Sequence, residues 1–578
     1  MCSIEGTTDK SVNIKKFTDF NKNRGPDGTN HFKDDWIQLG HNYLAISPNK
    51  ENKTQPYVSP KGNILVFNGE IYGLPPGTFD TQWLAEYLDE HGIAGLKYDV
   101  NGMWALAWYE PDKNKLTLCR DHFGQKPLYL FHDGNNLSFS STCRPLLAMQ
   151  EKKYGLHDRV DKEGLQFWDA CSRFSFSNIT VWHRIRRMVP GSILEYDLKK
   201  QKITGDDTLW GRDGKRFNLL PNHQWDEIEL EQKFEKAFNE VCNAPGINKT
   251  VSLSGGLDST LIASIARDQD NFSATSMKWV GNKNKTGDPN LGSQWYFGEH
   301  EMAMQTAKEL NIPFHTTKVN YKDQHKYNEE AQFALSGIPH WDRNRTNPRY
   351  LNIKNAAANG NKIYIIGDGA DELLTGYNGH FRLCEHLDWM TDDRLFHMST
   401  KDRKYMHIRN TIPHHLFTPL DPINNYLFMR GLSEIDSFCT VADSFTGQFG
   451  MESRTPFLHQ ELAKYLLRIP GATKLEVPIR EACKDQEGYA NKKHHKWFLL
   501  GHYKGIIRDN MKQHLPDHVR EKSRKVGFAH PWDSRDAEKN DIIGMQDWDI
   551  VKDQAKYFSF NVDFKHELED NVKQFETQ

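Results

Sequence analysis

Short apolar runs separated by turn residues make up most of the first two hundred positions of the chain. Four examples are NILVFNGEIYG (63–73), MWALAWYE (103–110), KLTLCRDHFG (115–124) and LYLFHDGNNLSFSS (128–141). Their spacing and their content of β-branched and aromatic residues predict strands. We expect a β-rich layered domain that closes with a last strand at 191–204, followed by a polar stretch at 205–217 that holds the domain boundary.

The pattern changes in the second half, where apolar positions at helical spacing appear in WDEIELEQKFEKAFNEVC (225–242). Segment 248–268 then combines a short apolar strand, a glycine turn and a helix, and segment 361–372 ends a strand in glycine and acidic residues. Alternating strands and helices predict a parallel α/β sheet with ligands at the carboxyl ends of its strands. We therefore expect two domains, at 2–210 and 220–578.

Composition describes an ordinary globular protein and narrows its partners. The 578 residues are 37% hydrophobic, and 74 basic against 77 acidic residues give a net charge of −3, so no global field recruits nucleic acid or an anionic membrane. Eight scattered cysteines without a CxxC pair predict reduced thiols in a cytoplasmic protein. No segment approaches the roughly 18 apolar residues that cross a bilayer, and no charged-then-apolar leader precedes the first strand.

The sequence SGGLDS lies between a predicted strand and a predicted helix. Free backbone N–H groups and the helix dipole attract an anion to such a turn, and its serines add hydroxyl donors. GxxxxGK[ST] is absent, so the loop is not a Walker A motif; it resembles the pyrophosphate loop of enzymes that cleave ATP between the α and β phosphates. Asp258 suits a magnesium-bound polyphosphate. An ordinary glycine-rich turn is the alternative, and the flanking strand and helix argue against it.

Three acidic residues, Asp368, Asp371 and Glu372, follow the strand within 361–372. They could hold a metal ion or a cationic substrate group at the end of the sheet. They could equally start a helix, because acidic side chains complement the dipole at a helix N-terminus. The residues alone leave both interpretations open.

The chain opens MCSIEG, which makes its second residue a cysteine. If Met1 is removed, Cys2 carries both a thiol with a pKa of about 8.5 and a free α-amine with a pKa of about 7.7–8.0, so the amine can accept the thiol proton near neutral pH. The alternative is a chance residue on a frayed terminus. Position alone favours this alternative, and the rest of the chain has to decide.

Nine segments occur in the order in which one enzyme family carries them. They are MCSI, RGPDG (24–28), FNGEIYG (67–73), RDHFGQKPLY (120–129), RIRRMVPGSILEYD (184–197), SLSGGLDST (252–260), GDGADELLTGY (367–377), ESRTPFL (452–458) and KVGF (525–528). Together they resemble glutamine-dependent asparagine synthetase, from residue 2 to about residue 531. Each segment alone is weak, but nine in order are specific, and they favour a nucleophilic role for Cys2.

The resemblance implies that the N-terminal half is an αββα sandwich of the Ntn-hydrolase type, in which two antiparallel sheets are stacked. The Cys2 thiolate would attack the side-chain amide of glutamine, giving a thioester and ammonia. The Asn68 side chain and the Gly69 backbone N–H match the oxyanion hole of the family. Glu70 and Asp80 match positions that bind the α-amino group of glutamine.

For the C-terminal half the resemblance implies a doubly wound parallel sheet of the adenine nucleotide alpha hydrolase type. A substrate carboxylate would attack the α-phosphorus of ATP, giving an acyl-adenylate and pyrophosphate, and ammonia would reach it through an apolar interdomain tunnel. Asp368 is assigned a catalytic role, and Lys525 matches the family's lysine near the α-phosphate, with a surface lysine as the alternative. The implied ATP-binding residues are Leu253, Ser254, Gly255, Gly256, Asp258, Ser259, Met277 and Gly367, with Asp258 and Asp371 as ligands of Mg²⁺.

Two positions depart from the family pattern. The chain has GHNYLAI (40–46) where the family commonly has GHRRLSI, so Tyr43 replaces an arginine that clamps the α-carboxylate of glutamine. A phenol gives one neutral hydrogen bond instead of a bidentate charged pair, so glutamine should bind weakly or the amide donor should differ. ESRTPFL is followed by His459, where an aspartate is usual. Asp368 occupies a position that is Asp or Glu in the family and does not name the acceptor.

We therefore predict an ATP-dependent, glutamine-hydrolysing amide ligase that converts aspartate to asparagine with ATP and Mg²⁺. One alternative is a related enzyme that amidates another carboxylate, such as a sugar acid. Another is a homologue that has lost catalysis and serves as a binding or regulatory subunit; the retained set Cys2, Asn68, Gly69, SGGLDS, Asp371 and Lys525 argues against it. The expected partners are small molecules, and family members are often dimers, which is compatible with a homodimer.

Overall fold

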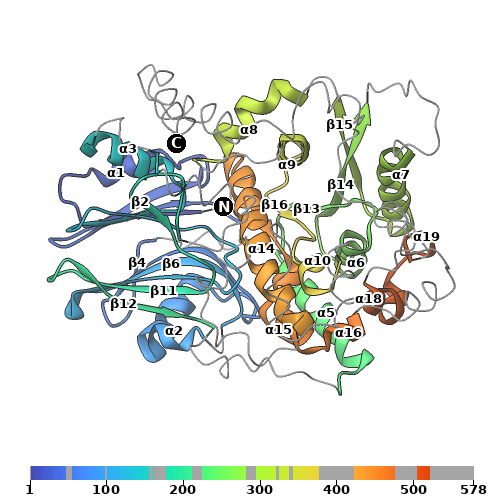
Figure 1. The fold of residues 1–578 in the computed structure, drawn as a ribbon, viewed down its shortest axis with the longest axis horizontal. Coiled ribbons are helices and arrows are strands. Elements are labelled where there is room, and N and C mark those ends of the chain that lie inside the picture. Colours follow the sequence, from blue (N-terminus) through green and yellow to red (C-terminus); the bar gives the residue numbers. More distant parts are fainter. Residues whose placement is uncertain are drawn as a thin grey trace, which may run out of the picture.

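The computed structural model describes residues 2–46, 55–97, 100–154, 160–161, 164, 178–210, 224–280, 294–320, 324–337, 343–376, 422–474 and 504–520. They form three β-sheets with flanking helices (Figure 1). Two six-stranded antiparallel sheets come from the residues before 210, and a five-stranded parallel sheet comes from the residues after 248. The predicted domain limits flank residues 211–223, which lie outside the described part of the chain.

The first antiparallel sheet has the strand order β10-β8-β9-β1-β3-β2. Its strands are β10 (Ile185–Arg187), β8 (Tyr129–His132), β9 (Leu137–Ser140), β1 (Ser3–Thr7), β3 (Gln38–Tyr43) and β2 (Gly28–Lys33). Helices α1 (Ile14–Asp19) and α3 (Arg144–Tyr154) cover its outer face, where Phe17, Phe131 and Leu146 share one apolar cluster.

The second antiparallel sheet lies against the first (Figure 1) and has the strand order β12-β11-β7-β6-β5-β4. Side chains alternate across its strand β5: Leu65 and Phe67 join an outer cluster with α2 (Asp80–Gly95), whereas Ile64 and Val66 share the inner core with Ile4 of the first sheet. Helices outside two stacked sheets confirm the predicted αββα sandwich. The strands are β12 (Lys202–Thr208), β11 (Ser192–Asp197), β7 (Lys115–Arg120), β6 (Gly102–Glu110), β5 (Ile64–Ile71) and β4 (Tyr57–Val58).

The third sheet is parallel throughout, with the order β15 (Phe314–Asn320), β14 (Phe272–Val280), β13 (Lys249–Ser252), β16 (Ile363–Ile365) and β17 (Glu452–Arg454). Ile363 and Ile365 enter the core beneath α5 (Glu227–Cys242), α6 (Leu257–Ala266) and α7 (Gln294–Glu309). Tyr364 faces the opposite core, beneath α8 (Asn328–Ala334), α9 (Arg343–Ala358) and α14 (Pro422–Gln448). Helices on both faces confirm the predicted doubly wound sheet.

Shorter elements connect these layers. They are η1 (Pro111–Lys113), η3 (Gln324–Tyr327), α10 (Ala370–Leu373), η6 (Pro456–Leu458), α15 (Gln460–Arg468), α16 (Gly471–Lys474), α18 (Gly505–Asn510), η9 (Lys512–His514) and α19 (Asp517–Arg520). No helix in the described ranges combines the length and the apolar content that crossing a bilayer requires.

The strand order of the parallel sheet reverses between β13 and β16. From β13 the chain continues to β14 on one side, and β16 pairs with β13 on the other. Loops that leave two such neighbouring strands in opposite directions open a crevice at their carboxyl ends, where ligands of α/β sheets bind. SGGLDS follows β13 and GDGADE follows β16, so the topology brings both motifs to this crevice.

Helix α14 lies between the sandwich and the parallel sheet (Figure 1) and supplies two buried carboxylates to the sandwich. Asp443 pairs with Arg24 at 2.7 Å. Asp436 pairs with Arg120 at 2.8 Å and with Arg187 at 2.9 Å. Because a charge removed from water must be paired, these contacts restrict how the two halves can dock.

One predicted strand differs from the structure. The sequence predicts a single strand at 191–204 and a polar link from 205, whereas the structure has a hairpin of β11 and β12 whose second strand runs to Thr208. The chain turns at residues 198–201, where Gln201 has a φ of 51°. β12 is a solvent-facing edge strand whose polar side chains do not alternate with apolar ones, and for that reason its sequence resembles a linker.

We predict that Asp436→Asn lowers the free energy of unfolding by about 3–5 kcal/mol, because it leaves the buried guanidinium of Arg120 and the partly buried one of Arg187 with one fewer charge partner. Chemical denaturation followed by tryptophan fluorescence measures the change. Glu301→Gln is the control: Glu301 pairs with Lys278 at 3.0 Å on the surface, so its loss should cost less than about 1 kcal/mol. Equal effects of the two substitutions would contradict the role given to Asp436.

Candidate active sites

Cys2 lies immediately before β1, at one wall of a cavity of about 1070 Å³. The Leu44 N–H donates to its Sγ, with 3.4 Å between nitrogen and sulfur. Burial raises the pKa of the Cys2 thiol to about 11, although the Leu44 hydrogen bond opposes this. Near neutral pH the thiol is therefore protonated, and it needs a base close by to become a nucleophile.

Asn68 and Gly69 lie on β5, as the sequence predicts for an oxyanion hole. Both polar atoms of the Asn68 side chain are buried without a hydrogen-bond partner among the described residues. Such groups are rare in folded proteins unless a ligand completes them. Gly69 lines the cavity, and a Cβ there would lie 2.0 Å from the Met103 carbonyl oxygen, so this position accepts only glycine.

Glu70 and Asp80 line the same cavity as Cys2. Asp80 begins α2 and accepts a hydrogen bond from the Thr81 N–H at 2.7 Å. Burial raises the pKa of Asp80 to about 6, with the Thr81 hydrogen bond opposing it. Burial also raises the pKa of Glu70 to about 8, although Arg454 opposes the shift. Two carboxyl groups in one cavity suit a ligand that brings an ammonium group.

Tyr43 ends β3 and also lines the cavity. Its hydroxyl is buried and has no hydrogen-bond partner in the described structure, and burial raises the pKa of the phenol. The group is therefore neutral at physiological pH and can donate one hydrogen bond to a ligand. The structure thus places Tyr43 beside Cys2, at the predicted glutamine-binding position.

The parallel-sheet half of the chain also contributes residues to this cavity. Sequence reasoning missed this contribution. Arg454, at the end of β17, lines it and donates to Glu70 at 3.0 Å and to Glu452 at 2.9 Å. It also donates to the carbonyl oxygens of Val241 and Asn243, at 3.0 and 3.1 Å. The arginine lies in the ESRTPFL segment, but its contact with a residue almost four hundred positions earlier is visible only in the fold.

The loop SGGLDS forms a tight turn from β13 into α6. Gly255 has a φ of 72°, and a Cβ there would come within 3.0 Å of the backbone of α7, so both conformation and space require glycine. The Ser254 N–H donates to Ser259 Oγ at 3.1 Å, and the Gly256 N–H donates to Ser254 Oγ at 3.3 Å. The turn is thus held by its own serines at the start of a helix, which is the arrangement that binds phosphate.

Other residues predicted to bind ATP surround this loop. Leu253 is buried between β13 and the loop, and Met277 lies in the neighbouring strand β14. A Cβ on Gly367 would lie 3.2 Å from the Cβ of Asp258, so the loops after β13 and β16 touch. The structure therefore brings the two acidic motifs together at the crevice.

Asp258 and Asp371 share one cation, the ammonium group of Lys504. Its Nζ lies 2.6 Å from Asp371 Oδ1 and forms an ion pair with Asp258. Although burial opposes it, the two carboxylates raise the pKa of Lys504. Carboxylates that converge on one cationic centre also fit Mg²⁺, which is held by a few carboxylates together with phosphate oxygens. Lys504 was not among the predicted residues.

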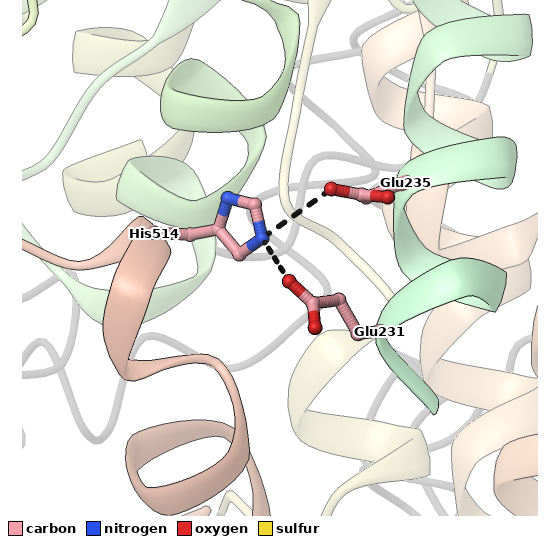
Figure 2. A group of neighbouring side chains, drawn as sticks. All are labelled: Glu231, Glu235 and His514. Atoms are coloured by element: carbon pink, nitrogen blue, oxygen red, sulfur yellow. Dashed lines mark hydrogen bonds and ion pairs between the residues drawn. The ribbon is translucent and has the colours of Figure 1, made fainter. Parts of the chain in front are cut away.

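A hydrogen bond from His514 also holds the segment that carries Lys504 against the parallel-sheet half. Figure 2 shows one ring nitrogen of His514 facing the carboxylates of both Glu231 and Glu235, which lie on α5. Nε2 of His514 lies 3.0 Å from Glu231 Oε1 and 3.6 Å from Glu235 Oε1. These contacts of His514 thus hold residues 504–514 against α5.

Asp368 follows Gly367 and forms an ion pair with Arg349 of α9, with 2.5 Å between Oδ2 and Nη2. The predicted Lys525 lies outside the described residues. Residues predicted to bind ATP and Mg²⁺ thus come together from two loops: Asp258 follows β13, and Gly367 and Asp371 follow β16.

Family models match both halves of the chain. A model described as asparagine synthase matches residues 230–560, which is more than half of the chain. A model described as glutamine amidotransferase domain matches residues 1–75 and 76–208. The chain belongs to the asparagine synthase family. This family membership confirms the resemblance seen in the sequence.

Individual relatives in the family are distant in sequence. Asparagine synthetase (glutamine-hydrolyzing) 2 of Bacillus subtilis is 23% identical over 506 residues, covering 80% of this chain and 65% of that protein. The glutamine-hydrolyzing asparagine synthetase of Sandersonia aurantiaca is 23% identical over 513 residues, covering 84% of this chain and 82% of that protein. Asparagine synthetase B of Escherichia coli K12 is 22% identical over 528 residues, covering 84% of this chain and 79% of that protein.

We predict that the pocket beside Cys2 binds glutamine more tightly as pH rises from about 5 to about 8.5. Raised pKa values leave Asp80 and Glu70 mostly protonated at the low end, and a protonated carboxyl cannot pair with an ammonium group. Calorimetry on the Cys2→Ala variant, which cannot turn glutamine over, measures the Kd directly. In a plot of Kd against pH, Asp80→Asn should remove the change near pH 6 and Glu70→Gln the change near pH 8. A Kd that does not change with pH would contradict the assignment.

Proposed function

We propose that the chain is a glutamine-hydrolysing asparagine synthetase that uses ATP and Mg²⁺ to convert aspartate to asparagine. The observation that carries the proposal is the presence, in one chain, of two sets of groups. One set surrounds Cys2 with unpartnered Asn68 amide atoms, and the other joins a phosphate-binding turn to paired carboxylates at the crevice of the parallel sheet. Family membership agrees with both sets.

In the sandwich, removal of Met1 would give Cys2 a free α-amine close to its thiol. The amine would take the thiol proton, because the buried thiol itself ionises only at high pH. The thiolate would attack the side-chain amide of glutamine while Asn68 and the Gly69 N–H bind the developing oxyanion. Ammonia would leave, and water would release glutamate from the thioester.

In the parallel-sheet half, the turn after β13 would bind the polyphosphate of ATP through backbone N–H groups and the hydroxyls of Ser254 and Ser259. Asp258 and Asp371 would hold Mg²⁺, whose charge would compensate that of the phosphates. Lys504 would place a further positive charge at the same point. The β-carboxylate of aspartate would attack the α-phosphorus of ATP and displace pyrophosphate, and ammonia would then displace AMP from the resulting adenylate.

A direct assay tests the whole proposal. The purified chain is incubated with ATP, Mg²⁺, glutamine and aspartate, and both pyrophosphate and asparagine are measured. We expect equal amounts of the two products. Pyrophosphate release that does not depend on aspartate, but does depend on another carboxylate, would contradict asparagine synthesis. It would indicate a related amide-forming reaction on that other acid.

We also propose a cytoplasmic location and a homodimer. The first is supported by the described cysteines, Cys2, Cys119, Cys143, Cys242 and Cys439, which are all unpaired. The second is an expectation from the family. Size-exclusion chromatography with light scattering measures the assembly.

We predict that Cys2→Ala abolishes glutamine-dependent asparagine formation and leaves ammonium-dependent formation intact, because the two halves perform separate steps. Amide formation with glutamine or with ammonium chloride is the measurement. Cys143→Ala, which removes a buried thiol beneath α3, is the control and should retain both activities. An equal loss of both activities in Cys2→Ala would show that the division of labour is wrong.

We predict a high Michaelis constant for glutamine, in the millimolar range, and at least a tenfold decrease in Tyr43→Arg. A guanidinium group gives the α-carboxylate a bidentate charged partner that a phenol lacks, and charged hydrogen bonds contribute about 1.5–3 kcal/mol. Steady-state glutaminase kinetics measure both values. Tyr43→Phe is the matched control and should not lower the constant. A wild-type constant in the low micromolar range would refute this interpretation of Tyr43.

A further inference from the structure

The ion pair between Arg349 and Asp368 differs from the ion pairs that hold the two halves together. In the pair of Arg24 with Asp443 the side chains are 3% and 0% exposed, whereas those of Arg349 and Asp368 are 18% and 23% exposed. Among the described residues, the guanidinium of Arg349 has this one hydrogen-bonded partner. The pair is therefore accessible, and Arg349 retains donors for another acceptor.

The pair lies beside the groups that would handle ATP. Asp368 directly follows Gly367, whose position faces Asp258. Three residues later, Asp371 shares the ammonium of Lys504 with Asp258. A molecule that contacts the pair is thus next to the phosphate-binding turn.

The chemistry of the pair matches one class of ligand. A guanidinium binds a carboxylate through two parallel hydrogen bonds, and a carboxylate binds an ammonium group. The head group of an α-amino acid presents these two charges on adjacent bonds. We propose that Arg349 binds the α-carboxylate of the acceptor and Asp368 binds its α-ammonium group, which leaves the side-chain carboxylate for reaction with ATP. The proposal rests on the proposed function, and it makes Arg349 the residue that selects an amino acid as acceptor.

Charge balance explains the expected selectivity. When an amino acid binds, its carboxylate takes the place of Asp368 as the partner of Arg349, and its ammonium group takes the place of Arg349 as the partner of Asp368. No partly buried charge is then left without a partner. A dicarboxylate without an amino group would take Arg349 from Asp368 and place a second anion beside it. An amine without the α-carboxylate would leave Arg349 unpaired.

Variants at position 349 test the proposal through aspartate-dependent pyrophosphate release with ammonium chloride as nitrogen source. Arg349→Met should raise the KM for aspartate at least tenfold and change the KM for ATP less than twofold, and Arg349→Lys should lie between it and the wild type. Lys354→Met is the matched control, because Lys354 lies on the same helix and pairs with Glu330 at 2.5 Å. Melting temperatures establish that each variant is folded. An unchanged KM for aspartate in Arg349→Met would overturn the proposal.

Acceptor analogues provide a second measurement. The wild type should use succinate, which lacks the amino group, and 3-aminopropanoate, which lacks the α-carboxylate, at least a hundredfold less efficiently than aspartate. Arg349→Met should lose discrimination against 3-aminopropanoate, and Asp368→Asn should lose discrimination against succinate. Use of succinate by the wild type as efficiently as aspartate would refute the assigned roles.

A binding measurement separates the two proposals. If the wild type releases no pyrophosphate with aspartate, the proposed function fails, and calorimetry with aspartate and a panel of other α-amino acids then judges Arg349 alone. Binding that Arg349→Met weakens at least tenfold would support the amino-acid site. Binding that Arg349→Met leaves unchanged, or the absence of binding by any amino acid, would overturn it.

Discussion

Paired charges without access to water determine how the two halves of this chain are joined. Arg24 reaches from the sandwich to Asp443 of α14, and Arg120 reaches to Asp436 of the same helix. A buried charge that loses its partner costs several kcal/mol, so neither half can slide or rotate on the other without breaking such a pair. Arg24 also donates to the carbonyl oxygen of Cys2 at 3.4 Å, so the contact that docks the halves also positions the start of β1.

The same constraint explains why the cavity beside Cys2 is built from both halves. Arg454 leaves the parallel sheet at β17 and meets Glu70 of the sandwich. Through the register of β16 and β17, Arg454 lies next to Ile365, three residues before Asp368. The cavity beside Cys2 and the loop after β16 are therefore connected by one short stretch of regular backbone, and their relative placement follows from the docking of the sheets.

Sequence reasoning predicted the parts of this protein that depend on local pattern. The short apolar run at 63–73, bounded by turn residues, predicted a strand where β5 lies, and the strand, glycine turn and helix around SGGLDS predicted a phosphate-binding turn. The hairpin of β11 and β12 was predicted as one strand, because the edge strand lacks the alternation that packing on one face imposes. Its pairing is set by the backbone of β11, which the side-chain pattern of β12 does not reveal.

The residues that sequence reasoning missed are those whose partners lie far away along the chain. Lys504 is 246 residues from Asp258, and Arg454 is 384 residues from Glu70. A basic residue is most often a solvated surface residue, so no local feature of the sequence assigned a role to Lys504, and the ESRTPFL segment did not reveal the partner of Arg454. Their positions become apparent only when the topology brings the ends of β13, β16 and β17 to one edge of the sheet.

Four of the carboxylates predicted to receive a cationic ligand group or a metal are paired with a basic side chain. Glu70 is paired with Arg454, Asp258 and Asp371 with Lys504, and Asp368 with Arg349. Binding is then an exchange of partners within a site that is already desolvated, so the ligand does not bear the cost of burying an isolated charge. Affinity in such a site depends on how well the ligand competes with the basic side chain. A change at Arg349, Arg454 or Lys504 should therefore alter selectivity even where the residue itself makes no contact with the reacting atoms.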